Sequence, residues 1–244
     1  MTALGVLGAR ALPVAPPLDW PPVSYDELTG ALRAVLPGLR PIGLVSPRQS
    51  GRRRLSMLAR LTGNPVVIKL GDGDDRLERE AAALDLLAAH PLPGIATPAP
   101  IAVGALTLPG ATQVSTYLVT TSISLGRQRP AIDAPLRTFE RDLATRLSSL
   151  PEPPREVAHD AEHADSASEL VPVHGDLTPW NLRRTSHGLA LFDWESAGWG
   201  PRGSDLAAYR RACDSVRPWW ALLQQHAPLP SPATPASPAR EPGA

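Results

Sequence analysis

One polar run near the C-terminal end of the chain constrains the fold most. Residues His174 to Asn181 read HGDLTPWN and directly follow a short apolar stretch, Leu170 to Val173. A second apolar stretch, Leu189 to Phe192, leads directly into Asp193. Short apolar runs bounded by turn-forming residues favour buried strands. The pattern therefore predicts two loops that each place a carboxylate at the end of a strand.

Hydrophobic patterning elsewhere predicts a mixture of strands and helices. The runs Leu55 to Arg60 and Pro65 to Leu70 flank the turn signal Thr62-Gly63-Asn64 and predict a hairpin. Asp75 to Ala89 has apolar residues at helical spacing, which predicts a helix. The other expected elements are a helix over Ser24 to Leu36, strands over Ile101 to Ala105 and Gln113 to Thr121, a helix over Ala134 to Leu150, and a last helix over Ser204 to Gln225 that Pro218 should break or kink.

This order of elements indicates an α+β chain in two lobes. We expect a flexible leader over residues 1–23 and a β-rich N-lobe over residues 24–125. A short, mainly helical C-lobe should follow over residues 126–226. Residues 227–244 are rich in Pro and Ala and are expected to be disordered.

Composition argues against nucleic acid and membranes as partners and bears on the location of the chain. The 244 residues carry a formal net charge of zero, so no global field favours nucleic acid or an anionic membrane. No apolar run approaches the length of a membrane-spanning helix. Cys213 is the one cysteine, which rules out an internal disulfide and fits a cytoplasmic location.

The spacing of the polar residues points to phosphoryl transfer. In kinase catalytic loops an Asp orients the substrate hydroxyl, and an Asn at the spacing of Asp176 and Asn181 holds a metal ion. A carboxylate at a strand end, such as Asp193, suits Mg²⁺. Each residue alone is better explained as part of a turn or cap. Their order, each after its own strand, favours the chemical interpretation.

At these residues the chain resembles the aminoglycoside phosphotransferase and choline kinase-like family, which shares the protein kinase-like fold. The resemblance covers the chain from about Ile42 to Tyr209. It is carried by His174 to Asn181, by Phe192-Asp193-Trp194-Glu195, and by the run from Gly200 to Ala207.

The resemblance implies roles for individual residues. Asp176 would be the catalytic base or hydroxyl-orienting residue, and Asn181 and Asp193 would bind Mg²⁺. His174 would brace the loop, and Asp205 would be the structural aspartate that steadies it.

The N-lobe would bind ATP. Lys69, the one lysine in an arginine-rich chain, lies where the family places its phosphate-binding lysine. Glu80 on the next helix would hold it, with Glu78 the less favoured alternative; otherwise, Lys69 would be a lysine that extends from a strand edge to solvent. The backbone of Ser122 to Leu125, including Ser124, would form the hinge that pairs with adenine.

Other segments have two interpretations each. Ser50 and Gly51 lie where phosphates would be covered and offer backbone N–H groups, but their loop is equally typical of a solvated turn. The acidic stretch from Glu152 to Glu169 is more typical of a solvated linker than of a surface that attracts a cationic acceptor. Trp180 and Trp194 would stack on a ligand or pack between the lobes.

Two departures from protein kinases narrow the substrate. Gly175 stands where protein kinases have Arg, and the stretch between Asp193 and Asp205 is too short for a peptide-docking segment. We therefore predict transfer of the γ-phosphate of ATP to a hydroxyl of a small molecule, such as an aminoglycoside-, choline- or sugar-like acceptor. The short region after Asp205 leaves one alternative open, a nucleotide-binding scaffold that no longer catalyses.

Overall fold

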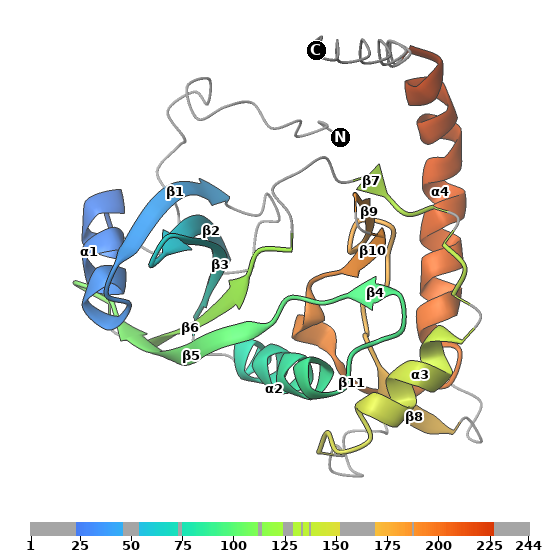
Figure 1. Ribbon diagram of the computed structural model, residues 1–244, viewed down its shortest axis with the longest axis horizontal. Coiled ribbons are helices and arrows are strands. Elements are labelled where there is room, and N and C mark those ends of the chain that lie inside the picture. Colours follow the sequence, from blue (N-terminus) through green and yellow to red (C-terminus); the bar gives the residue numbers. More distant parts are fainter. Residues whose placement is uncertain are drawn as a thin grey trace, which may run out of the picture.

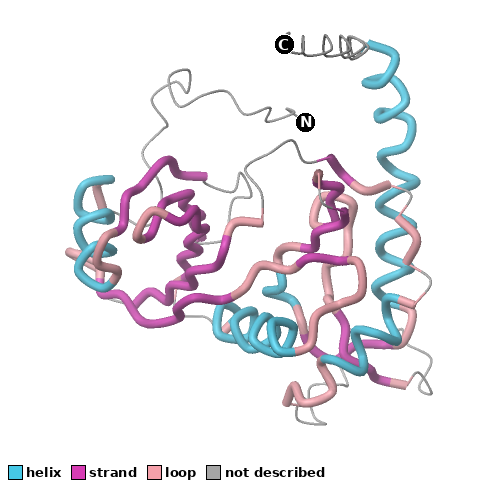
Figure 2. Tube along the Cα trace, viewed as in Figure 1, coloured by secondary structure: helices cyan, strands magenta, loops and turns pink. Residues whose placement is uncertain are grey.

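The structure is a computed structural model that describes residues 23–45, 54–72, 75–111, 114–123, 129–132, 134–136, 138–151, 169–186 and 188–226, the last nine of them by backbone only. It has the predicted α+β, two-lobed, kinase-like architecture: a β-rich lobe lies beside a lobe that is flanked by one long helix (Figures 1 and 2). The expectations for the leader before Val23, the stretch 152–168 and the tail after His226 lie outside the described residues.

A five-stranded antiparallel sheet forms the N-lobe, in the order β1-β2-β3-β6-β5. Its strands are β1 (Leu39–Val45), β2 (Arg54–Leu61), β3 (Asn64–Gly71), β5 (Pro100–Thr107) and β6 (Val114–Thr121). The predicted hairpin is confirmed as β2 and β3. Thr62 and Gly63 between them both have positive φ, 49° and 93°, as in tight turns whose twist matches that of the strands.

Helix α1 (Tyr25–Val35) covers one face of this sheet. It begins at a capping box, in which the Ser24 hydroxyl accepts from the Glu27 N–H and the Glu27 carboxylate accepts from the Ser24 N–H. Leu28 and Leu32 are buried in a cluster with the apolar side chains of that face. The expected helix over Ser24 to Leu36 is therefore confirmed with slightly shorter bounds.

Helix α2 (Arg76–Ala89) packs on the opposite face, as Figure 1 shows for its place beneath the sheet. Its residues Leu77 and Ala81 form a small buried cluster with Leu118 of β6. Lys69 of β3 lies directly opposite Leu118 in the strand register. Because cross-strand partners share a face, Lys69 points toward α2.

The described part of the C-lobe combines two small sheets with two helices. A four-stranded sheet has the order β4-β10-β9-β7, and a two-stranded sheet pairs β11 with β8. The elements are β4 (Ile95–Ala96), β7 (Arg129–Pro130), α3 (Phe139–Arg146), β8 (Leu170–Val173), β9 (Leu182–Thr185), β10 (Gly188–Leu191), the 3₁₀ turn η2 (Trp194–Ser196), β11 (Gly198–Pro201) and α4 (Ser204–His226). No helix in the described part of the chain is both long and apolar enough to cross a membrane.

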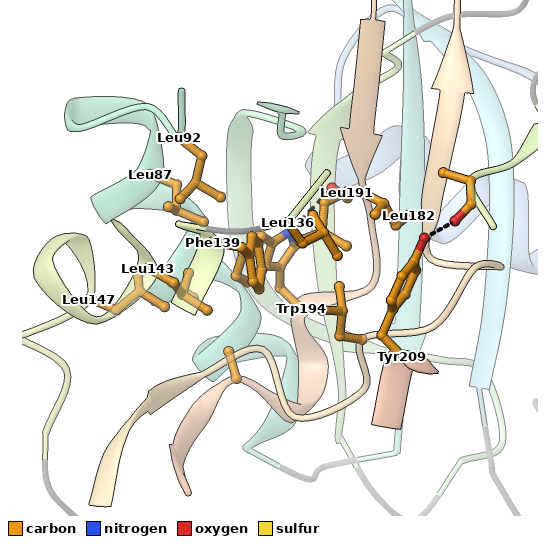
Figure 3. Packing of buried hydrophobic residues seen from close by; sticks show 14 of the residues in the cluster. Leu87, Leu92, Leu136, Phe139, Leu143, Leu147, Leu182, Leu191, Trp194 and Tyr209 are labelled. Carbon is orange, nitrogen blue, oxygen red and sulfur yellow. Dashed lines mark hydrogen bonds between the residues drawn. The ribbon is translucent and has the colours of Figure 1, made fainter. Parts of the chain in front are cut away.

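The C-lobe core reaches back to α2. Figure 3 shows Leu87 of α2 in the same cluster as Phe139 and Leu143 of α3, with Trp194 at its centre. Trp194 is fully buried, and its indole N–H donates to the carbonyl of Leu191. Helix α2 therefore packs against both lobes, which fixes its position between the sheet and the segment after β10.

Two helix expectations need correction. The helix expected from Ala134 to Leu150 begins only at Phe139 and ends at Arg146. Pro135 disfavours helical backbone at Ala134, whose N–H donates instead to the hydroxyl of Tyr209. The last helix is confirmed as α4, but the break expected at Pro218 is wrong, because α4 continues through this residue to His226.

Candidate active site

The loop between β8 and β9 carries the central carboxylate. Asp176 is exposed to solvent. The side-chain amide of Asn181 donates at 2.9 Å both to the backbone carbonyl of Asp176 and to its Oδ2. At the end of the loop, the backbone N–H of Asn181 donates to the carbonyl of Thr178. The loop is therefore closed on itself by these bonds, and the Asp176 carboxylate is held in one orientation.

The Asp205 side chain holds the start of this loop by hydrogen bonds to its backbone. Its two carboxylate oxygens accept the backbone N–H groups of His174 at 2.6 Å and Gly175 at 3.0 Å, and its side chain is 2% exposed. Burial raises the pKa of Asp205 to about 6, although the two N–H bonds act in the opposite direction. The first turn of α4 is thereby tied to the residues just before Asp176.

His174 joins the two acidic loops. Its Nδ1 accepts the N–H of Asp176 at 3.2 Å, and its Nε2 lies 3.0 Å from the carbonyl oxygen of Phe192. An accepting Nδ1 requires the tautomer that is protonated at Nε2, which then donates to Phe192. Burial lowers the pKa of His174 to about 4, so the ring is neutral at physiological pH. Its ring and that of Trp194 are in an edge-to-face contact, with centroids 4.5 Å apart.

The position of Gly175 explains why no arginine precedes Asp176 here. Gly175 has φ +79°, a conformation that side chains disfavour. A Cβ atom on Gly175 would lie 2.2 Å from the carbonyl oxygen of Ser196. The loop of Asp176 thus packs directly on η2, and any side chain at Gly175 would push the two segments apart.

Asp193 has a left-handed backbone, with φ 64° and ψ 65°, that is uncommon for a residue other than glycine. Its Oδ1 lies 2.6 Å from Nζ of Lys69. Both carboxylate oxygens of Glu80 lie 2.8 Å from the same Nζ. Glu80 Oε1 also accepts the backbone N–H of Trp194 at 3.3 Å. Lys69 therefore bridges the helix carboxylate and the strand-end carboxylate.

The charges at this bridge shift the pKa values of its members. Burial acts to lower the pKa of Lys69, but the carboxylates of Glu80 and Asp193 raise it above its ordinary value. Burial acts to raise the pKa of Asp193, but the Lys69 charge and hydrogen bond, with smaller effects of His174 and Arg54, lower it. Lys69 is therefore protonated and Asp193 ionised at neutral pH.

The structure also distinguishes among the sequence candidates. Glu80, 1% exposed, contacts Lys69, whereas Glu78 accepts a hydrogen bond from the Thr116 hydroxyl. The N–H of Ser122 donates to the carbonyl of Pro65. The candidates Ser50, Gly51 and Ser124 lie outside the described residues. Trp194 packs in the core, and Trp180 is 38% exposed.

One pair near the site was missed by sequence reasoning. Arg54, at the start of β2, forms an ion pair with Glu195 of η2. A run of three arginines, Arg52 to Arg54, directly precedes the apolar residues of β2, but no periodicity distinguishes the third from the first two. A groove of about 710 Å³ beside α4 has none of these residues in its lining and is not part of the candidate site.

Comparisons with known proteins show the fold and a similarity to one family over part of the chain. The structures of an aminoglycoside-3'-phosphotransferase of type VIII (21% identity, TM-score 0.52, 85% of this chain and 95% of that chain) and of aminoglycoside phosphotransferase APH(4)-Ia (10%, 0.54, 83% and 83%) share the fold. So does amicoumacin kinase hAmiN in complex with AMP-PNP, Ca²⁺ and Ami (14%, 0.53, 79% and 70%).

No curated protein matches the chain by sequence. The family model described as the phosphotransferase enzyme family, APH, matches residues 120–238, which include the loop of Asp176, Asp193 and the whole of α4. The resemblance drawn from the sequence is confirmed: over these residues the chain is similar to the phosphotransferase enzyme family.

Proposed function

We propose that the protein transfers the γ-phosphate of ATP, in the presence of Mg²⁺, to a hydroxyl group of a small molecule. The observation that carries this proposal is the bridge made by Lys69 between Glu80 and Asp193, beside a loop that presents Asp176. Phosphoryl transfer depends mainly on alignment and on neutralisation of negative charge. A fixed cation and a fixed carboxylate on adjacent segments meet both requirements.

Lys69 would bind the donor. Its ammonium group is held by the buried carboxylate of Glu80 and stays protonated, so it can attract phosphate oxygens without first being ordered. Because the Ser122 N–H is already bonded to Pro65, an adenine contact at Ser122 would use its carbonyl. The fold neighbour amicoumacin kinase, whose structure is a complex with AMP-PNP and Ca²⁺, supports a nucleotide donor and a divalent metal.

Asn181 and Asp193 fit a magnesium ion. The amide nitrogen of Asn181 is engaged by Asp176, which directs its oxygen elsewhere, and the Asp193 side chain is 38% exposed. Mg²⁺ is usually held by one or two protein oxygens together with phosphate oxygens and water. When bound, Mg²⁺ would neutralise charge on the phosphate oxygens.

Asp176 would act on the acceptor. A bond forms between the acceptor oxygen and the γ-phosphorus, while the bond from phosphorus to the β–γ bridging oxygen breaks. The hydroxyl proton passes to the Asp176 carboxylate, and ADP leaves with the electrons of the broken bond. Asn181 holds the carboxylate in place through its amide, and His174 and Asp205 fix the backbone around it.

Small hydroxyl acceptors suit this site better than proteins. The Gly175 position has no room for a side chain, so it does not carry the arginine that protein kinases have there. The segment between Asp193 and Asp205 is filled by η2, β11 and the start of α4, which leaves no long peptide-docking loop. An aminoglycoside-, choline- or sugar-like hydroxyl is therefore the acceptor that we propose. The intact Lys69 bridge gives no support to the non-catalytic alternative.

The test is phosphate transfer from labelled Mg-ATP across a panel of aminoglycosides, amino alcohols and sugars. Asp176→Asn keeps the shape of the side chain and removes the proton acceptor, so we expect transfer to fall by about 10²- to 10⁴-fold. Asp85→Asn changes an exposed carboxylate of α2 to an amide in the same way and serves as the matched control. Full activity in Asp176→Asn, or no transfer by the wild type to any acceptor, would refute the proposal.

A further inference from the structure

Charged side chains of the N-lobe reach three successive residues of the C-lobe. Lys69 contacts the Asp193 carboxylate, Glu80 accepts the backbone N–H of Trp194, and Arg54 pairs with the Glu195 carboxylate. The first two contacts belong to the donor site described above. The third has no place in that chemistry, although it involves the residue two positions after Asp193.

The Arg54–Glu195 pair is well shielded from water. The two side chains are 13% and 9% exposed. Leu55, the neighbour of Arg54, is buried in the N-lobe core, and Trp194, the neighbour of Glu195, is buried in the C-lobe core. Each charge is therefore held close to a rigid core, and the ion pair connects the two cores across the donor site.

Burial of this pair is costly and needs a reason. Removal of two charges from water carries a large desolvation penalty, and a buried ion pair contributes little net stability compared with apolar residues of similar size. What it does impose is geometry, because each charge requires its partner at one position. Such a pair between two lobes favours the closed arrangement over any opening that would separate the charges.

The contacts around Asp193 indicate what this geometry does. Its left-handed conformation is unfavourable for a non-glycine residue and persists only where its neighbours hold it. On one side the carbonyl of Phe192 is bonded to His174. On the other side the chain is fixed by Glu80 and by the pair of Glu195 with Arg54.

We propose that Arg54 and Glu195 are positioning residues whose ion pair holds the lobes closed at the donor site and keeps Asp193 in its left-handed conformation. The proposal rests on the proposed function for its effect on nucleotide binding. Its effect on lobe closure needs no ligand. The two effects are therefore measured separately on the full chain.

The first experiment measures MgADP affinity by titration calorimetry in Arg54→Gln, Glu195→Gln, the double variant and the charge-swapped Arg54→Glu/Glu195→Arg. Each single variant should weaken binding by about 5- to 150-fold, the usual range of coupling between distinct elements. The double variant should bind as weakly as either single one, and the swap should restore part of the affinity. Arg54→Lys, which keeps the charge but loses the planar fork, should bind with intermediate affinity.

Glu169→Gln is the matched control, because it removes the partner of Arg202 in an exposed ion pair and should leave MgADP affinity unchanged. A lower urea midpoint with unchanged affinity in the Arg54 and Glu195 variants would show an ordinary structural pair and would overturn the proposal. The proposal would also be overturned if the losses of MgADP affinity in the two single variants multiplied in the double variant, since residues that act as a pair are not additive.

The second experiment measures the radius of gyration by small-angle scattering without ligand. The Arg54→Gln and Glu195→Gln variants should be larger than the wild type and Glu169→Gln, because their lobes open. Equal radii would overturn lobe closure even if the wild type binds no nucleotide. Conversely, the variants could have larger radii and weaker MgADP binding while the wild type transfers no phosphate. That result would support the positioning role of Arg54 and Glu195 and would reject only the proposed function.

Discussion

Protonation of His174 should destabilise the fold by a predictable amount. The pKa of this buried ring is about 4 in the folded chain and 6.5 in an exposed reference. The folded value lies below the unfolded one, so the stabilising contribution is complete above pH 6.5 and is lost as the pH falls to 4. At about 1.4 kcal/mol per pKa unit, the loss amounts to about 3 kcal/mol.

Urea unfolding of the metal-free protein in EDTA at pH 7 and pH 4 measures this loss. His174→Gln keeps a donor for the Phe192 carbonyl but does not titrate. The variant should be less stable than the wild type at pH 7, and that deficit should shrink by about 3 kcal/mol at pH 4. His90→Gln, which alters an exposed histidine after α2, is the control. A deficit of His174→Gln that is the same at both pH values would refute the reasoning.

Three further perturbations address other parts of the site. Burial raises the pKa of Asp205 to about 6, so the stability that this group contributes is lost as the pH rises from 3.8 through 6. In the same urea assay, the free energy of unfolding of Asp205→Asn should therefore rise by about 3 kcal/mol relative to that of the wild type over this pH range. Gly175→Ala should lower the free energy of unfolding by about 2 kcal/mol or more, because Gly175 has positive φ and an added Cβ atom would clash with a backbone oxygen. Gly30→Ala in α1 is the control: an added Cβ atom meets no neighbour there, so the free energy of unfolding should rise by about 0.5–1 kcal/mol. Glu80→Gln should weaken MgADP binding in calorimetry by about tenfold, because the lysine loses its buried partner, while Glu78→Gln should bind as the wild type does; equal affinities of the two variants would contradict this assignment.

The sequence predicted most of the local structure around the site. The hairpin of β2 and β3, helix α2 and the strands before Asp176 and Asp193 all follow from turn residues and short-range hydrophobic periodicity. Helix α3 was predicted too long, although Pro135 already disfavours helical backbone at Ala134. Hydrophobic spacing alone did not locate either end of this helix.

Selection between neighbouring candidates required the tertiary structure. Glu78 and Glu80 lie on the same helix, and only the packing of α2 against both lobes orients Glu80 toward Lys69. Trp180 and Trp194 were equally open to stacking or packing by sequence, but one is exposed and the other fills the C-lobe core. The orientation of a helix or loop depends on what it packs against, and that information is non-local.

The sequence by itself therefore determined which residue types stand at the ends of which strands: Asp176 and Asn181 on one loop, Asp193 on the next, and a single lysine on β3. Local chain stiffness and hydrophobic patterning are sufficient for that. The tertiary structure alone decided that Lys69 bridges two carboxylates, that Gly175 lies against Ser196, and that Arg54 meets Glu195 across the lobes. These contacts join residues distant in sequence, and they form only because the buried cores of the two lobes bring them within reach of one another.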